Sequence, residues 1–144
     1  MDRALVVVNS GDAEQVLGKR AGEFATALDA DLHVVKFADQ SEYQRQLEKS
    51  AANSRNFDSM EDVKAHAREQ AQRYADKVFG DLDVEVAGVV DNLPNGIVSY
   101  AEEHNCDHIF VTGRKRSPSG KVLFGDTAQS IILNFEGPVT VITV

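Results

Sequence analysis

The stretch NGIVSYAEEHNCDHIFVTG, residues 95–113, decides the fold of this chain. Its first part places Ile97, Val98 and Ala101 at helical spacing, and the preceding Pro94 suits the first turn of a helix. Its last part contains the short apolar run 109–111, which is typical of a strand buried on both faces of a parallel sheet. The stretch therefore predicts a helix over 94–105 that leads directly into a strand.

Helical and strand patterns alternate in the same way along the whole chain. The other expected strands, which are mostly apolar and β-branched, are 5–8, 32–35, 84–90 and 139–144. The other expected helices, on which apolar residues recur at intervals of three and four, are 13–29, 59–80 and 121–135. We expect Val16, Leu28 and Ile132 to face the core from these helices. The polar segment 38–58 leaves room for a short additional helix at 41–52. This alternation predicts a doubly wound parallel sheet with helices on both faces.

Composition bounds the function. The 144 residues fit a single domain, 1–144, and the formal net charge of −8 argues against a nucleic-acid or anionic membrane surface. The only cysteine, Cys106, excludes an internal disulfide and suits a reducing compartment. No signal-peptide pattern opens the chain, and no apolar run approaches the roughly 20 residues of a membrane span. We expect a cytoplasmic protein that contacts neither nucleic acid nor membrane.

The segment 113–121 is the most informative part of the chain for function. It carries Arg114, Lys115, Arg116 and Lys121 without a single acidic residue, and it begins at Gly113. A glycine-bearing loop before a helix directs backbone N–H groups at an anion, and the basic side chains would reinforce them. The segment is therefore either a phosphate-binding loop or a solvated basic loop on an acidic protein.

Established phosphate-binding and catalytic motifs do not match. Gly120-Lys121 resembles the end of a Walker A loop, but Lys115 stands at its first glycine and Val122 replaces the Mg²⁺-binding Ser or Thr. The chain has neither the G-x-G-x-x-G dinucleotide pattern after its first strand nor a G-x-S-x-G nucleophile motif. We therefore expect a protein without enzymatic activity.

Three other polar groups have two interpretations each. Asp126, which follows the basic loop, either pairs with those bases and backbone N–H groups or holds Mg²⁺ opposite a phosphate. The cluster 104–108 offers metal-ligand side chains at a spacing poor for zinc, and a polar helix end with an apolar Cys106 is the alternative. His33 lies within an apolar strand and is predicted to be packed and hydrogen-bonded rather than a catalytic base.

Taken together, three stretches resemble the universal stress protein family. The first is the opening strand 3–10 with the helix that follows it, and the second is 95–113, similar to the family passage I…A.E…D.I..G. The third runs from Gly113 to Ala128 and continues at 137–142, which resembles the family's glycine loop, helix and PV.VV ending. Each stretch alone is weak evidence for the family, but the order and spacing of the three stretches over nearly the whole chain are specific to it.

This resemblance implies an α/β fold of the Rossmann-like, adenine nucleotide alpha hydrolase-like class, with a doubly wound five-stranded parallel sheet in the order 3-2-1-4-5. It implies a cytoplasmic, stress-related regulatory protein that forms a homodimer through its last strand, 138–144. One branch of the family binds ATP or AMP, with Mg²⁺, and another does not. A non-nucleotide-binding dimeric interaction module is therefore an alternative, and a weak metal-dependent phosphohydrolase using Asp126 is a third.

The loop departs from the pattern G-x2-G-x9-G-[ST] of the ATP-binding branch. Gly113 matches, but Arg116 replaces the second glycine and Gly125 comes one residue early. Asp126 stands at the Ser/Thr position and Asn9 at that of an adenosine-contacting Asp. Charge-assisted contacts from the arginines would replace lost backbone contacts to a phosphorylated ligand. The candidate nucleotide contacts are Asn9, Ser10, the backbone of Val35, Gly113, Arg114, Arg116, Gly125, Asp126 and Thr127.

Overall fold

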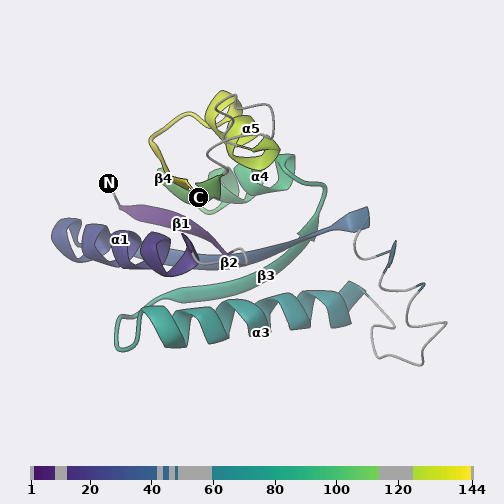
Figure 1. Ribbon diagram of the computed structural model, residues 1–144, viewed down its shortest axis with the longest axis horizontal. Coiled ribbons are helices and arrows are strands. Elements are labelled where there is room, and N and C mark those ends of the chain that lie inside the picture. Colours follow the sequence, from purple (N-terminus) through teal and green to yellow (C-terminus); the bar gives the residue numbers. More distant parts are fainter. Residues whose placement is uncertain are drawn as a thin grey trace.

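A computed structural model shows helices and strands that alternate from end to end (Figure 1). It describes residues 2–8, 13–41, 44–45, 48, 60–113 and 125–143. The strands are β1 (Arg3–Val8), β2 (Asp31–Asp39), β3 (Glu85–Asp91), β4 (His108–Gly113) and β5 (Val139–Thr143). The helices with continuous bounds are α1 (Ala13–Leu28), α3 (Met60–Val78), α4 (Asn95–Glu103) and α5 (Asp126–Asn134).

The five strands form one parallel sheet in the order β3-β2-β1-β4-β5, which confirms the predicted topology. The order reverses at β1, which lies in the centre with β2 on one side and β4 on the other. Its residues Leu5 and Val6 are completely buried. The nearly continuous apolar composition of this strand follows from that position, because both of its faces are covered.

Helices cover both faces of the sheet, and each face has its own apolar core (Figure 1). Alternate strand residues point to opposite faces. Val6 and Val34 meet Leu17 of α1 and Ala71 of α3 on one face. The other core brings together strand residues and helical residues of α4 and α5, among them Leu5, Val7, Val35, Ile97, Ala101 and Ile131. Among the helices in the described ranges, none combines the length and apolar character needed to cross a membrane.

Several expected boundaries and orientations prove wrong. β2 extends to Asp39 rather than ending at residue 35, because Phe37 and Ala38 remain buried. Helix α5 begins at Asp126 rather than at residue 121; Lys121 to Phe124 lie outside the described residues. In the segment expected as a helix over 41–52, the described positions 41, 44–45 and 48 are helical, and the other positions lie outside that description.

On α1 and α5 the stripe of buried residues is narrower than the apolar pattern indicates. Val16, Leu28 and Ile132 are 48%, 49% and 43% exposed, although each was expected to face the core. On α1, Leu17 and Ala21 occupy the central line of contact with the sheet, so that Val16 and Leu28 lie on the flanks of the helix. Isolated apolar residues at such positions are normal on protein surfaces.

Helix α3 approaches β3 so closely that only glycine fits at one position. Gly88 of β3 faces the helix, and a Cβ atom built on it would overlap the backbone nitrogen of Arg68 and the carbonyl oxygen of Lys64. Because these neighbours are backbone atoms of a long helix, they cannot move aside as the end of a flexible side chain would. The closeness of the two elements therefore depends on this glycine.

We expect Gly88→Ala to lower the free energy of unfolding by about 1–3 kcal/mol, the usual cost of overpacking a core. Gly22→Ala is the matched control. A Cβ atom at Gly22 would make ordinary contact, 3.6 Å from Phe79, and alanine favours the helix by about 0.5–1 kcal/mol. Urea unfolding of both variants measures the difference. Equal stability of the two variants would contradict the close approach of α3 to β3.

Candidate functional site

The central strands separate at the carboxyl edge of the sheet. Pairing between β1 and β4 ends at Val6 and Phe110, yet β1 continues to Val8 and β4 to Gly113. On their outer sides both strands stay paired to these ends, because Val8 lies beside Lys36 of β2 and Gly113 beside Thr143 of β5. The divergence falls where the strand order reverses, and ligands of doubly wound sheets bind at such a point.

The first turn of α5 lies at this same edge, because the helix runs back across the sheet to the start of β5. Gly125 precedes the helix with φ 82° and ψ 157°, a conformation that favours glycine. No side chain of the described residues caps the helix, and Asp126 and Thr127 are exposed in its first turn. The N–H groups of an uncapped first turn are available to an anion.

Helix α4 begins at the same edge but has an anion of its own. Asp91, the last residue of β3, has its carboxylate so close to Gly96 that a Cβ atom there would lie 2.8 Å from the Oδ2 atom. The same carboxylate accepts a hydrogen bond from the backbone N–H of Asn92 through Oδ1, at 2.7 Å. A carboxylate is favourable beside the first turn of a helix. Among the described residues neither helix has a side-chain cap, and α5 is the one without a carboxylate from a neighbouring strand against its N-terminus.

The structure brings only part of the predicted site together. Val35 is completely buried within β2, between Val7 of β1 and Ala87 of β3, and it lies one residue short of the level at which β1 ends. Gly113 ends β4, and Gly125, Asp126 and Thr127 begin α5 at this edge. The predicted contacts Asn9, Ser10, Arg114 and Arg116 lie outside the described residues.

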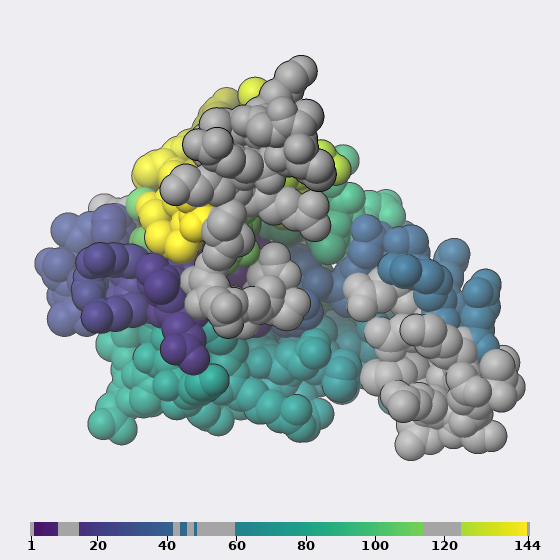
Figure 2. Space-filling view, viewed as in Figure 1, coloured from purple at the N-terminus to yellow at the C-terminus, as the bar shows by residue number. Residues whose placement is uncertain are grey.

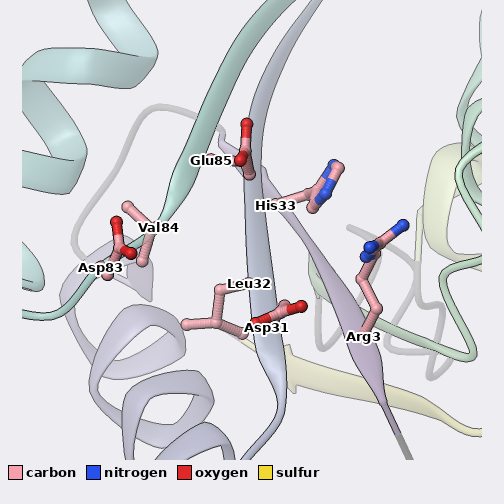
Figure 3. A pocket seen from close by; sticks show the side chains of 7 residues that line it. All are labelled: Arg3, Asp31, Leu32, His33, Asp83, Val84 and Glu85. Atoms are coloured by element: carbon pink, nitrogen blue, oxygen red, sulfur yellow. The ribbon is translucent and has the colours of Figure 1, made fainter.

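A polar cavity of about 110 Å³ lies at the opposite, amino edge of the sheet (Figure 3). The residues that line it come from the starts of β1, β2 and β3 and from the turn before β3: Arg3, Asp31, Leu32, His33, Asp83, Val84 and Glu85. Register places Arg3 beside Asp31 and His33 beside Glu85, which the sequence alone did not indicate. With three carboxylates at its wall, this cavity is electrostatically unsuited to a phosphate group.

His33 joins this cavity to α4. It is 9% exposed, and its Nδ1 atom lies 3.3 Å from the hydroxyl of Tyr100, so it is packed and hydrogen-bonded as predicted. Tyr100 stacks on His104, whose carbonyl oxygen accepts a hydrogen bond of 2.6 Å from the Arg3 guanidinium. Burial lowers the pKa of His33, and the nearby Arg3 charge lowers it further, while Glu85 opposes both.

The cluster 104–108 is a helix end rather than a metal centre in the described part of the chain. No group of three or more His, Cys, Asp or Glu residues there could hold a metal ion. Cys106 is buried, and that burial raises the pKa of its thiol to about 11, so it is a small apolar side chain and not a reactive thiolate.

Comparison with known proteins agrees with this fold. The family model described as "Universal stress protein family" matches residues 1–143. No curated protein sequence matches the chain. Among solved structures, universal stress protein UspA from Lactobacillus plantarum has a TM-score of 0.70 at 23% identity, covering 98% of this chain and 97% of the other.

Two similar structures contain nucleotides. A universal stress protein in complex with cAMP has a TM-score of 0.65 at 18% identity, covering 99% of this chain and 96% of the other. The universal stress protein from Archaeoglobus fulgidus in complex with dAMP has a TM-score of 0.59 at 16% identity, covering 98% and 97%. At these identities the likeness establishes the fold.

The buried His33 predicts a pH dependence of stability. Because its pKa is lowered in the folded chain, its contribution is complete above the ordinary value of about 6.5 and is lost as the pH falls below that value. We expect the free energy of unfolding to decrease between pH 7.5 and pH 5.5, and to decrease less in His33→Gln, which no longer titrates. Urea unfolding at the two pH values measures both differences, and an identical decrease in the two proteins would refute the assignment.

Proposed function

The chain belongs to the universal stress protein family, and we propose that it is a cytoplasmic regulatory protein of the stress response that binds ATP or AMP at the carboxyl edge of its sheet. The observation that carries the proposal is the divergence of β1 and β4 beside the uncapped first turn of α5. The relatives in complex with cAMP and dAMP support an adenine nucleotide as the ligand. The reduced Cys106 suits the cytoplasm.

The phosphates would lie at α5 rather than at α4. The carboxylate of Asp91 already faces the first turn of α4, so a phosphate there would meet a negative charge at short range. No side chain in the described part of the chain caps the first turn of α5, and Gly125 can take a conformation that brings backbone close to a ligand. In the sequence, Arg114 and Arg116 follow Gly113 directly and would supply charge-assisted contacts.

Asp126 sets the balance of charge at this site. Its carboxylate is exposed in the first turn of α5, where it repels a phosphate group. The arginines must outweigh this repulsion, or an Mg²⁺ ion that accompanies the nucleotide must screen it. A single carboxylate gives little support to a hydrolase that would use Asp126 to hold a metal, so we propose binding without catalysis and without an obligatory cofactor.

A second proposal concerns assembly. We propose that two copies associate through β5, which pairs with β4 on one side only. The yellow C-terminal residues lie at the surface in Figure 2. The N–H of Ile109 donates to the carbonyl of Pro138 at 3.1 Å, so the alternation of a parallel ladder directs the N–H groups of Val139, Val141 and Thr143 to the open side. Unpaired edge groups of this kind are a template for another strand. A dimeric interaction module that binds no nucleotide would form the same dimer.

Two variants with opposite expected effects on nucleotide affinity test the proposed site. We expect Arg114→Ala with Arg116→Ala to weaken AMP and ATP binding more than tenfold, because charge-assisted contacts to phosphate are lost. Asp126→Asn should strengthen binding about two- to fivefold, because it removes one nearby negative charge in a solvated site. Isothermal titration calorimetry with each nucleotide, with and without Mg²⁺, measures both changes.

Glu69→Gln is the control for the change in net charge, because Glu69 lies on α3 in an exposed pair with Arg73 and its variant should bind as the parent does. An unchanged affinity in the double arginine variant would refute the loop assignment. Absence of binding by the parent protein to all nucleotides would favour the interaction module instead.

A proline on the free edge tests the dimer. Val141→Pro removes an outward N–H group and leaves the β4 ladder intact, since proline is tolerated on edge strands. We expect the parent chain to sediment as a dimer and Val141→Pro as a monomer, while Val141→Thr, which keeps the N–H group, remains dimeric. Circular dichroism confirms that each variant is folded. A monomeric parent, or a proline variant that still dimerises, would contradict pairing through β5.

A further inference from the structure

A second buried histidine lies far from the carboxyl edge and has no part in nucleotide binding. His108 is the first residue of β4 and is 5% exposed, on the face of the sheet that α1 covers. Its ring stacks on Phe110 with centroids 4.4 Å apart and meets the edge of Phe24 at 4.8 Å. The imidazole is thus enclosed by aromatic carbon, a setting in which a charged ring is costly.

The two ring nitrogens have different surroundings. Nε2 lies 2.8 Å from the hydroxyl oxygen of Thr140 on β5. Nδ1 is buried and has no hydrogen-bond partner among the described residues. The form of the ring that fits these surroundings best is the neutral one in which Nε2–H donates to the Thr140 hydroxyl and Nδ1 keeps only a lone pair. Protonation would place an N–H group at Nδ1 that has no acceptor, and would add a buried charge.

The charged groups around His108 do not compensate for that charge. Asp107 raises the pKa of the ring, but burial is the larger effect and lowers it. The Asp107 carboxylate is already engaged, because its Oδ2 atom accepts a hydrogen bond from the N–H of Asp2 at 3.0 Å. On α1, Arg20 and Glu23 pair with each other at 3.0 Å and are exposed. β1 places the apolar Ala4 beside the ring, and β5 contributes the neutral Thr140.

The partner of His108 lies on an edge strand of the described sheet. β5 pairs with β4 alone, and Thr140 is its second residue. Thr140 and the two phenylalanines also line an open groove between α1 and β5, so solvent reaches the immediate neighbours of the ring. If the ring leaves its position, β5 loses a side-chain contact to β4 at its beginning.

We propose that His108 is a proton-sensitive latch, which holds the start of β5 against β4 while the ring is neutral and releases it when the ring is protonated. The proposal does not depend on nucleotide binding. It assigns to the fold a device by which acidification loosens the one edge strand through which we propose that copies associate.

The linkage between protonation of His108 and folding fixes the direction of the pH effect and the pH range in which it occurs. The folded state prefers the neutral ring, so the contribution of His108 is complete above about pH 6.5 and is lost as the pH falls below that value. For a single proton, the equilibrium constant of local opening rises by at most about tenfold per pH unit. The effect belongs to β5 and not to β2 and β3, which are paired on the other side of β1.

Amide hydrogen exchange at pH 7.5 and pH 5.5, corrected for the intrinsic exchange rate, tests the latch. The N–H groups of Thr140 and Ile142, which face β4, are expected to lose about threefold or more of their protection at the lower pH relative to those of β2. In His108→Phe, which keeps an aromatic ring but cannot titrate, this difference should disappear. In the matched control His33→Phe, which removes the other buried histidine, it should persist.

Equal loss of β5 protection in the parent and in His108→Phe, or no relative loss in the parent, would overturn the proposal. Should His108→Phe fail to fold, the native chain still decides the question. The Cε1–H resonance of His108 must titrate with a pKa below about 6.5, the ordinary value, and the loss of β5 protection must follow the same titration. Separate titrations, or an ordinary pKa for His108, would equally refute the latch.

Discussion

The whole structure depends on β1 being paired on both sides and covered on both faces. Its residues Leu5 and Val6 belong to different cores, so one strand of six residues holds the two helical layers together. The same position creates the site. The chain leaves β1 toward β2 on one side and comes back to β4 on the other, and the two ladders end at different levels. The divergence at the carboxyl edge therefore follows from the topology.

The alternation of strands and helices was predictable because burial on both faces of a sheet leaves a signal in composition, whereas the strand order 3-2-1-4-5 was implied only by the family resemblance. Apolar runs bounded by polar turns marked all five strands, and the helical intervals marked four helices. The boundaries failed where the local pattern was ambiguous. Lys36 interrupts the apolar run of β2 in the sequence, but the strand continues past it because Phe37 and Ala38 are buried in the core. Before α5 the apolar run 122–124 extends the helical pattern of the sequence, but Gly125 has a positive φ and the helix begins after it.

The candidate site was predictable in place but not in detail. Parallel strands direct their carboxyl ends to one edge, so Gly113 and the start of α5 could be assigned to it from the sequence. The contact between Asp91 and Gly96 could not, because it depends on how β3 and α4 pack and no motif records it. Yet this contact distinguishes the two helix N-termini. The amino-edge cavity was missed for the same reason: its polar residues are distant in sequence and become neighbours through the register of three strands.

The proposed nucleotide site and the two buried histidines lie at opposite ends of the sheet, and both would act through the stability of the fold. His33 and His108 both lie near the amino ends of their strands, on different faces of the sheet. The folded chain favours the neutral form of each ring, because burial lowers both pKa values. A ligand at a hundred times its dissociation constant stabilises the fold that binds it by about 2.7 kcal/mol. A bound nucleotide would stabilise the folded state, and protonation of either histidine destabilises the same state, so the two effects would oppose each other although the nucleotide would touch neither ring.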